Sequence, residues 1–250
     1  MTASVRFKKI AVINFSGNVG KSTLARYLLA PRLPGATLVA IESINSDALS
    51  GQVVRGSEFG RLQEDMLLEE TALVDIGSSN VEQFLDLMRQ FHGSHEDFDL
   101  YVVPCVPAAK QQRDTMACVR ALAQLGIPRD KIRLVLNMVP AGAAIEDEFA
   151  PLFAFSVSEG LCLVDRHASV ERTELFGRLR ELEASIEGVL SDATDYKQAI
   201  AQTRDADEKL ALASRLSVRR LAAGAVGSLD QAFHALMTMA AAERAQPGAV

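Results

Sequence analysis

Five short apolar runs in the first part of the chain lack the alternation of a half-exposed strand. They are rich in Val, Ile and Leu and cover Lys9–Asn14, Thr37–Ile41, Thr71–Ile76, Leu100–Cys105 and Ile132–Met138. Continuous apolar strands of this kind are buried on both faces, as in parallel sheets. Helical patterns separate them, for example from Val81 to Met88 and over Thr115–Leu125. This alternation predicts an α/β fold with a doubly wound, mostly parallel sheet.

The pattern of the last third is different. From about Ala168 onward it is helical only, with apolar residues at three- and four-residue spacing over Val170–Leu190, Asp207–Ala222 and Ser228–Ala242. We therefore expect residues 1–167 to form the core and residues 168–250 to form a C-terminal helical layer packed on it. A partner-binding role for this layer is compatible with the pattern.

Composition narrows the class of protein. The chain is 48% hydrophobic and 23% charged, which is typical of a folded globular protein. A net charge of −6 argues against a surface that coats nucleic acid, although a local basic patch is still allowed. Cys105, Cys118 and Cys162 have no metal-type spacing and are expected to be buried thiols. Because no signal core and no membrane-length apolar stretch is found, we expect a cytoplasmic protein with no membrane partner.

The segment after the first apolar run carries the strongest chemical signal. It reads Asn14-Phe15-Ser16-Gly17-Asn18-Val19-Gly20-Lys21-Ser22-Thr23, a Gly-containing loop between a strand and a helix. Backbone N–H groups must converge on a phosphate, and side chains beyond Cβ would block their approach. Gly17 and Gly20 leave that space, and Asn18 tolerates a positive φ.

We predict that this segment is a nucleotide-binding loop. The predicted contacts come from Gly17, Asn18, Val19, Gly20, Lys21, Ser22 and Thr23. Lys21 would bridge the β- and γ-phosphates, Ser22 would hold Mg²⁺ and Thr23 would reach the α-phosphate. The full G-x-x-x-x-G-K-[ST] pattern is not met, because its first position falls on Phe15. The alternative is a chance Gly-Lys-Ser turn after a strand.

The loop resembles the variant Walker A motif, K-G-G-x-G-K-[ST], of the ParA/MinD group of P-loop ATPases. Gly17, Gly20, Lys21 and Ser22 match it, and the wider segment Ile10–Thr23 resembles the StbB-like plasmid-stability proteins of that group. The resemblance implies ATP and Mg²⁺ as ligands, a homodimer, and a protein partner in plasmid stability, partition or conjugative transfer. The group's signature lysine falls on Ser16, which cannot place a positive charge on a neighbour's γ-phosphate. We therefore expect any ATP hydrolysis to be slow.

Two further segments carry candidate catalytic groups. Asp75 ends the third apolar run and would orient Mg²⁺ through a water, while Gly77 would offer its N–H to the γ-phosphate. The resemblance implies an aspartate after the second run that positions the attacking water. Glu42 and Asp47 both stand there, and either could serve. Asp47 could equally cap the next helix.

The remaining candidates concern the base and a substitute cation. In the resembling group, an asparagine at the position of Asn137 hydrogen-bonds adenine, although a strand-end Asn can also satisfy a turn. Lys110 or Arg55 could replace the missing lysine, or could be solvated charges.

Arginines of the C-terminal region could contact DNA phosphates, but interleaved acidic residues favour a solvated face. Two other functions stay open at this stage. One is a P-loop small-molecule kinase or ATP-dependent ligase, and the other is a non-hydrolysing nucleotide-binding adaptor. The kinase would need a lid rich in arginine, and no compact segment of the sequence provides one.

Overall fold

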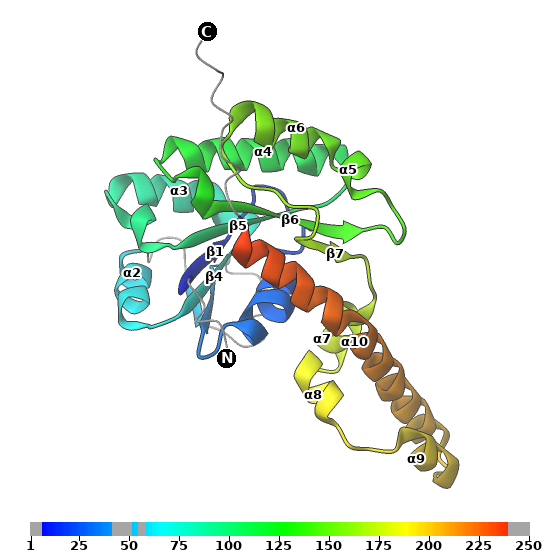
Figure 1. Ribbon diagram of the computed structural model, residues 1–250. Helices are drawn as coiled ribbons and strands as arrows, with labels where there is room; N and C mark the ends of the chain where they lie inside the picture. The colour runs from blue at the N-terminus through cyan, green and yellow to red at the C-terminus, as the bar shows by residue number, and fades with distance from the viewer. Residues whose placement is uncertain (1–6, 42–51, 55–58, 240–250) are drawn as a thin grey trace.

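The computed structural model describes residues 7–41, 52–54 and 59–239 of the chain. Its described part contains a seven-stranded sheet with the order β3-β2-β4-β1-β5-β6-β7 (Figure 1). The strands are β1 (Lys9–Val12), β2 (Thr37–Ile41), β3 (Gln52–Val54), β4 (Ala72–Ile76), β5 (Leu100–Cys105), β6 (Ile132–Val139) and β7 (Ser169–Glu171). Neighbouring strands all run parallel. The predicted doubly wound parallel sheet is confirmed.

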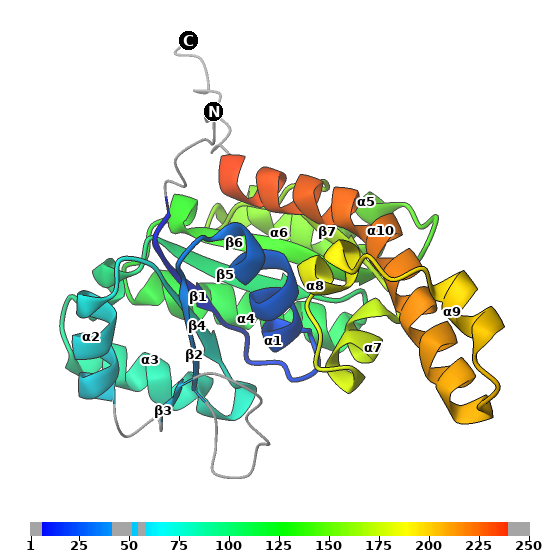
Figure 2. The ribbon, with the colours of Figure 1, turned by 90° about the horizontal axis from the view of Figure 1, so that it is seen from below.

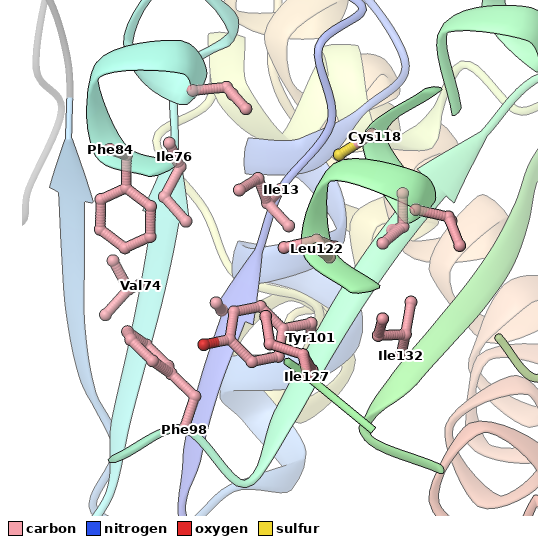
Figure 3. Close-up of a cluster of buried hydrophobic side chains, with 14 of the residues drawn as sticks. Ile13, Val74, Ile76, Phe84, Phe98, Tyr101, Cys118, Leu122, Ile127 and Ile132 are labelled. Carbon is pink, nitrogen blue, oxygen red and sulfur yellow. The ribbon is translucent and has the colours of Figure 1, made fainter. Parts of the chain in front are cut away.

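One face of the sheet is covered by four helices. These are α2 (Phe59–Leu68), α3 (Val81–Gln90), α4 (Ala109–Gln124) and α6 (Ala150–Glu159), and the short α5 (Ile145–Glu148) precedes α6. Their apolar residues pack with alternate strand residues such as Ile13, Val74 and Tyr101 in one buried cluster (Figure 3). Short 3₁₀ turns at Ser78–Asn80, Ser94–Asp97 and Arg129–Lys131 connect these elements.

The other face is covered by the first helix of the chain and by the C-terminal helices (Figure 2). Helix α1 (Lys21–Leu24) continues as a π-helix over Ala25–Leu29 and a 3₁₀ turn over Ala30–Arg32. The C-terminal elements are α7 (Leu175–Glu181), α8 (Ile186–Ser191), α9 (Tyr196–Gln202) and α10 (Ala206–Thr238). Strand residues that face this side of the sheet, such as Ile10 and Val12, complete this second buried cluster. Because β1 is buried on both faces, its residues from Ile10 to Val12 are all apolar.

The prediction that the chain is helical only after Ala168 is wrong. Residues Ser169–Glu171 form β7, whose pairing with β6 supplies backbone hydrogen bonds that override the helical pattern. The helix predicted over Val170–Leu190 is also interrupted. Glu183 has a φ of 49° between α7 and α8, and the Ser185 side chain accepts a hydrogen bond from the Gly188 N–H to start α8. The boundary at residue 167 between the two predicted regions stays a prediction.

The helices predicted over Asp207–Ala222 and Ser228–Ala242 are one continuous helix, α10. Gly224 and Gly227 lie inside it, because a glycine weakens a helix without having to end it. Arg133 in β6 fixes the C-terminal end by donating from Nη1 to the Leu236 carbonyl at 2.6 Å. A cation at a helix C-terminus is favourable. The first half of α10 projects beyond the sheet together with α9 (Figure 1).

The three cysteines are buried, as expected. Among the described helices, none is both long enough and apolar enough to cross a membrane.

Candidate functional site

The candidate site lies where β1, β4 and β5 end. Val12 pairs with Asp75 of β4 and with Val102 of β5, so the segments that follow these strands leave the sheet side by side. The Ile13 N–H extends the pairing by donating to the Val102 carbonyl at 3.0 Å. Ligands of open α/β sheets bind at this carboxyl edge.

The loop after β1 has a conformation that few residues tolerate. Asn18 has a φ of 57° and Gly20 a φ of 86°, both in the left-handed region. A Cβ atom on Gly20 would lie 2.2 Å from the Asn137 Nδ2 atom, so glycine is required there by space as well as by conformation. Val19 is fully buried and anchors the loop, while Gly17 and Asn18 are exposed. The loop therefore presents its backbone to the solvent side.

Lys21 begins α1 and folds back across the loop. Its Nζ atom donates to the Ser16 carbonyl at 2.9 Å and to the Asn14 carbonyl at 3.2 Å. The side chain is only 7% exposed. Burial lowers the pKa of Lys21 below its ordinary value, while the Asp75 carboxylate and then Cys118 oppose that shift. A poorly solvated ammonium at the loop would gain from a phosphate anion.

The remaining predicted loop contacts follow in the first turn of α1. Ser22 is exposed and Thr23 is half-buried, so both lie within reach of a ligand bound at the loop. Asp75 is buried at the end of β4, near enough to Lys21 to affect its pKa. In the described part of the chain, no group of three His, Cys, Asp or Glu side chains could hold a metal ion. A Mg²⁺ ion at the predicted Ser22 and Asp75 would thus also need phosphate oxygens as ligands, and this site stays a prediction.

Comparison with known proteins bears on the fold. No protein-family model and no curated protein sequence matches the chain. Among solved structures, apo McdA from Cyanothece matches with a TM-score of 0.50 and 10% identity, over 84% of this chain and 98% of McdA. The chain has the fold of McdA.

Two other solved structures are less similar. MinD from Pyrococcus horikoshii, in complex with Mg-ADP, matches with a TM-score of 0.47 and 13% identity over 86% of this chain and 97% of MinD. A plasmid partition protein from Borrelia burgdorferi, bound to AMPPNP, matches with a TM-score of 0.47 and 12% identity over 84% of this chain and 97% of the partition protein.

The residue at the signature position of the ParA/MinD loop turns inward in this chain. Ser16 is 5% exposed, and its hydroxyl donates to Asp114 Oδ2 of α4 at 2.7 Å. Its N–H donates to Asn14 Oδ1 at 2.9 Å. Asn14 in turn donates from Nδ2 to the Pro104 carbonyl and to Thr115 Oγ1, both at 2.7 Å. Sequence reasoning missed Asp114, Thr115 and this role of Asn14; the only signal was a polar residue at the end of the first apolar run.

The segment after β4 is tied to the end of β2. The Gly77 N–H donates to the Ile41 carbonyl at 2.9 Å, so the predicted contact of this N–H with a γ-phosphate requires that bond to open. Asn80 Nδ2 lies 3.3 Å from the same carbonyl. Ser78, which the sequence did not single out, lies closest to the loop, with its Oγ atom 3.5 Å from the position of a Cβ on Gly17.

Asn137 supports the loop after β1 from β6. It is 2% exposed and donates from Nδ2 to the Val19 carbonyl at 2.8 Å. The next residue, Met138, has a φ of 55°, and the β6–β7 register shifts between Leu136 and Val139. Irregularities of this kind redirect side chains at the end of a strand. The adenine contact of Asn137 stays a prediction, beside this observed contact with the loop.

For the other predicted residues, no contact with the loop is seen in the described part of the structure. Lys110 is exposed in the first turn of α4. Glu42, Asp47 and Arg55 lie outside the described residues. In the C-terminal region, Arg219 has a structural role, because its Nη1 atom donates to the Asp192 and Thr194 carbonyls and its guanidinium lies over the Tyr196 ring.

Proposed function

We propose that this protein is an ATP–Mg²⁺-dependent molecular switch of the ParA/MinD type that acts in plasmid stability, partition or conjugative transfer. The observation that carries the proposal is the loop itself, whose left-handed backbone at Asn18 and Gly20 leads into the buried ammonium of Lys21. The plasmid role, the homodimer and the protein partner rest on the resemblance of the loop sequence to StbB-like proteins.

Each residue of the loop has a separate task in this proposal. The backbone of Gly17–Gly20 binds the phosphates, and Lys21 moves from the loop carbonyls toward the β- and γ-phosphates. Ser22 and Asp75 would hold Mg²⁺, directly and through water. When bound, Mg²⁺ supplies positive charge that neutralises the phosphates. Asn137 keeps Val19, and with it the loop backbone, in place.

The switch itself would be the segment from Gly77 to Asn80 and the helix that follows it. The Gly77 N–H is held by Ile41, and Ser78 lies against the loop at Gly17. A γ-phosphate that captures the Gly77 N–H would release Ile41 and shift the start of α3. Nucleotide-dependent ordering of a segment beside a γ-phosphate is a common switching mechanism. Hydrolysis would be slow, because Ser16 supplies no cation.

Amide hydrogen exchange tests the switch. We expect the segment covering Ile76–Gln90 to exchange at different rates with ATP–Mg²⁺ and with ADP–Mg²⁺. The α6 segment, on the same face of the sheet but away from the loop, serves as an internal control and should not respond. Identical exchange over Ile76–Gln90 in the two nucleotide states would contradict a switch, even if both nucleotides bind.

A further inference from the structure

We propose that Asp114 is a positioning residue that sets the conformation of the phosphate loop through Ser16, and thereby couples α4 to nucleotide binding. The inference deepens the proposed function and rests on it for its binding consequence. Its structural basis is independent of any nucleotide, since all the contacts are made within the chain.

Ser16 is the point where three hydrogen bonds of the loop meet. Its hydroxyl donates to Asp114 Oδ2 at 2.7 Å, and its N–H donates to Asn14 Oδ1 at 2.9 Å. Its carbonyl accepts from Lys21 Nζ at 2.9 Å. One residue therefore joins α4, the end of β1 and the phosphate-binding lysine.

A second contact between α4 and the loop acts beside the first. Thr115, which is fully buried, accepts from Asn14 Nδ2 at 2.7 Å and donates to the Gln111 carbonyl of its own helix at 2.7 Å. Asn14 is also fully buried, and its own carbonyl is the second acceptor of Lys21. Buried polar networks that are satisfied in this way are rigid, because breaking one bond leaves a desolvated group unpaired.

The two contacts differ in what they control. Thr115 and Asn14 fix the end of the strand, whereas Asp114 holds the hydroxyl of the first loop residue. Without Asp114, the Ser16 hydroxyl no longer anchors the loop backbone to α4, so the Ser16 carbonyl and the loop amides that follow it are held less firmly in place. A movement of the first turns of α4, where Lys110 and Arg113 are exposed, would reach the lysine by the same route.

Calorimetric titration with ATP–Mg²⁺ tests the coupling in the full-length protein. Ser16→Ala and Asp114→Ala should each weaken binding by about 10-fold, the scale of one hydrogen bond to a charged group. The double variant should lose no more than either single variant. Asp114→Asn keeps an acceptor for the Ser16 hydroxyl and should stay within about 2-fold of the wild type.

Glu159→Ala is the matched control for this experiment. Glu159 also bonds α4, through Arg120 near the far end of the helix, so its loss should not affect nucleotide affinity. Additive losses in the double variant would overturn the proposal. So would an Asp114→Asn variant as weak as Asp114→Ala, or a Glu159→Ala variant equally impaired.

Hydrogen exchange of the nucleotide-free protein separates this inference from the proposed function. Amides of the segment Asn14–Leu24 should exchange faster in Ser16→Ala and Asp114→Ala than in the wild type, and at wild-type rates in Asp114→Asn and Glu159→Ala. Unchanged exchange in the two disrupting variants would overturn the proposal, whether or not the protein binds nucleotide. If the wild type binds no ATP–Mg²⁺ while exchange responds as expected, the proposed function fails and the positioning role of Asp114 is supported.

Discussion

At the scale of single residues, the loop after β1 combines unfavourable conformations with buried polar groups. Asn18 and Gly20 occupy the left-handed region, and Met138 does so at the end of the adjoining β6. Lys21 is held in a site whose burial lowers its pKa. Such features cost stability in an empty protein and persist only where the surrounding structure holds them. They lie together at one edge of the sheet, which is why we place the function there.

Gly20→Ala tests whether the loop needs glycine for space as well as for conformation. Gly35 provides the matched control, because its φ is 74° and a Cβ there would have no atom within 4 Å. Gly35→Ala should lower the free energy of unfolding by about 1 kcal/mol, from the left-handed backbone alone. Gly20→Ala should lower the free energy of unfolding by about 1 kcal/mol more than Gly35→Ala does, because the added Cβ displaces Asn137 from the Val19 carbonyl.

Chemical denaturation of both glycine variants and of Asn137→Ala measures these changes in the free energy of unfolding. The double variant Gly20→Ala with Asn137→Ala should lose less than the sum of the two single variants, since the clash is then removed. Equal losses for Gly20→Ala and Gly35→Ala, or strict additivity in the double variant, would show that the close contact between Gly20 and Asn137 has no energetic weight.

At the scale of elements, α10 connects the sheet to the projecting arm. Its C-terminal end is held by Arg133 against the Leu236 carbonyl, with the guanidinium also 4.7 Å from the centre of the Phe7 ring. At the other end, the Asp205 side chain accepts from the Glu208 N–H and begins the helix. A continuous helix of this length is stabilised mainly by packing.

Alanine at Gly224 and Gly227 tests the continuity of α10. Both glycines are exposed and a Cβ at either position would meet no atom within 4 Å. Each substitution should raise the free energy of unfolding by about 0.5–1 kcal/mol, the helix-propensity difference between the two residues. Thermal or urea denaturation gives the measurement. A decrease in stability would indicate that the helix breaks between residues 223 and 228.

The same elements show which parts of the fold could be predicted from the sequence. Both β2 and β5 were predicted with their observed ends, because each is a short apolar run without alternation. The three-residue strands β3 and β7 were not predicted, since pairing with a neighbouring strand, rather than their own pattern, makes them strands. At the site, too, some features could be predicted from local sequence and others could not. Its glycines and Lys21 follow a local motif, whereas the bond between Ser16 and Asp114 joins positions 98 residues apart.

At the scale of the whole molecule, the parallel α/β fold brings the loop after β1, the end of β4 and the first turns of α4 to one edge of a seven-stranded sheet. The C-terminal helices cover the opposite face from α4 and leave this edge to the loop. This arrangement would allow the loop to bind a nucleotide, as we propose, while the arm of α9 and the first half of α10 contacts a partner. Ser16, whose inward hydroxyl donates to Asp114 of α4, ties the loop to its own chain.

Calorimetric titration with ATP–Mg²⁺ shows whether Lys21 and the loop before it bind a nucleoside triphosphate. Lys131→Ala is the matched control, because Lys131 Nζ also donates to two backbone carbonyls, those of Phe98 and Glu96, away from the loop. The wild type and Lys131→Ala should bind alike, and Lys21→Ala should bind at least about 100-fold more weakly while it still unfolds cooperatively. Equal affinity in a folded Lys21→Ala variant, or no binding by the wild type, would contradict the account.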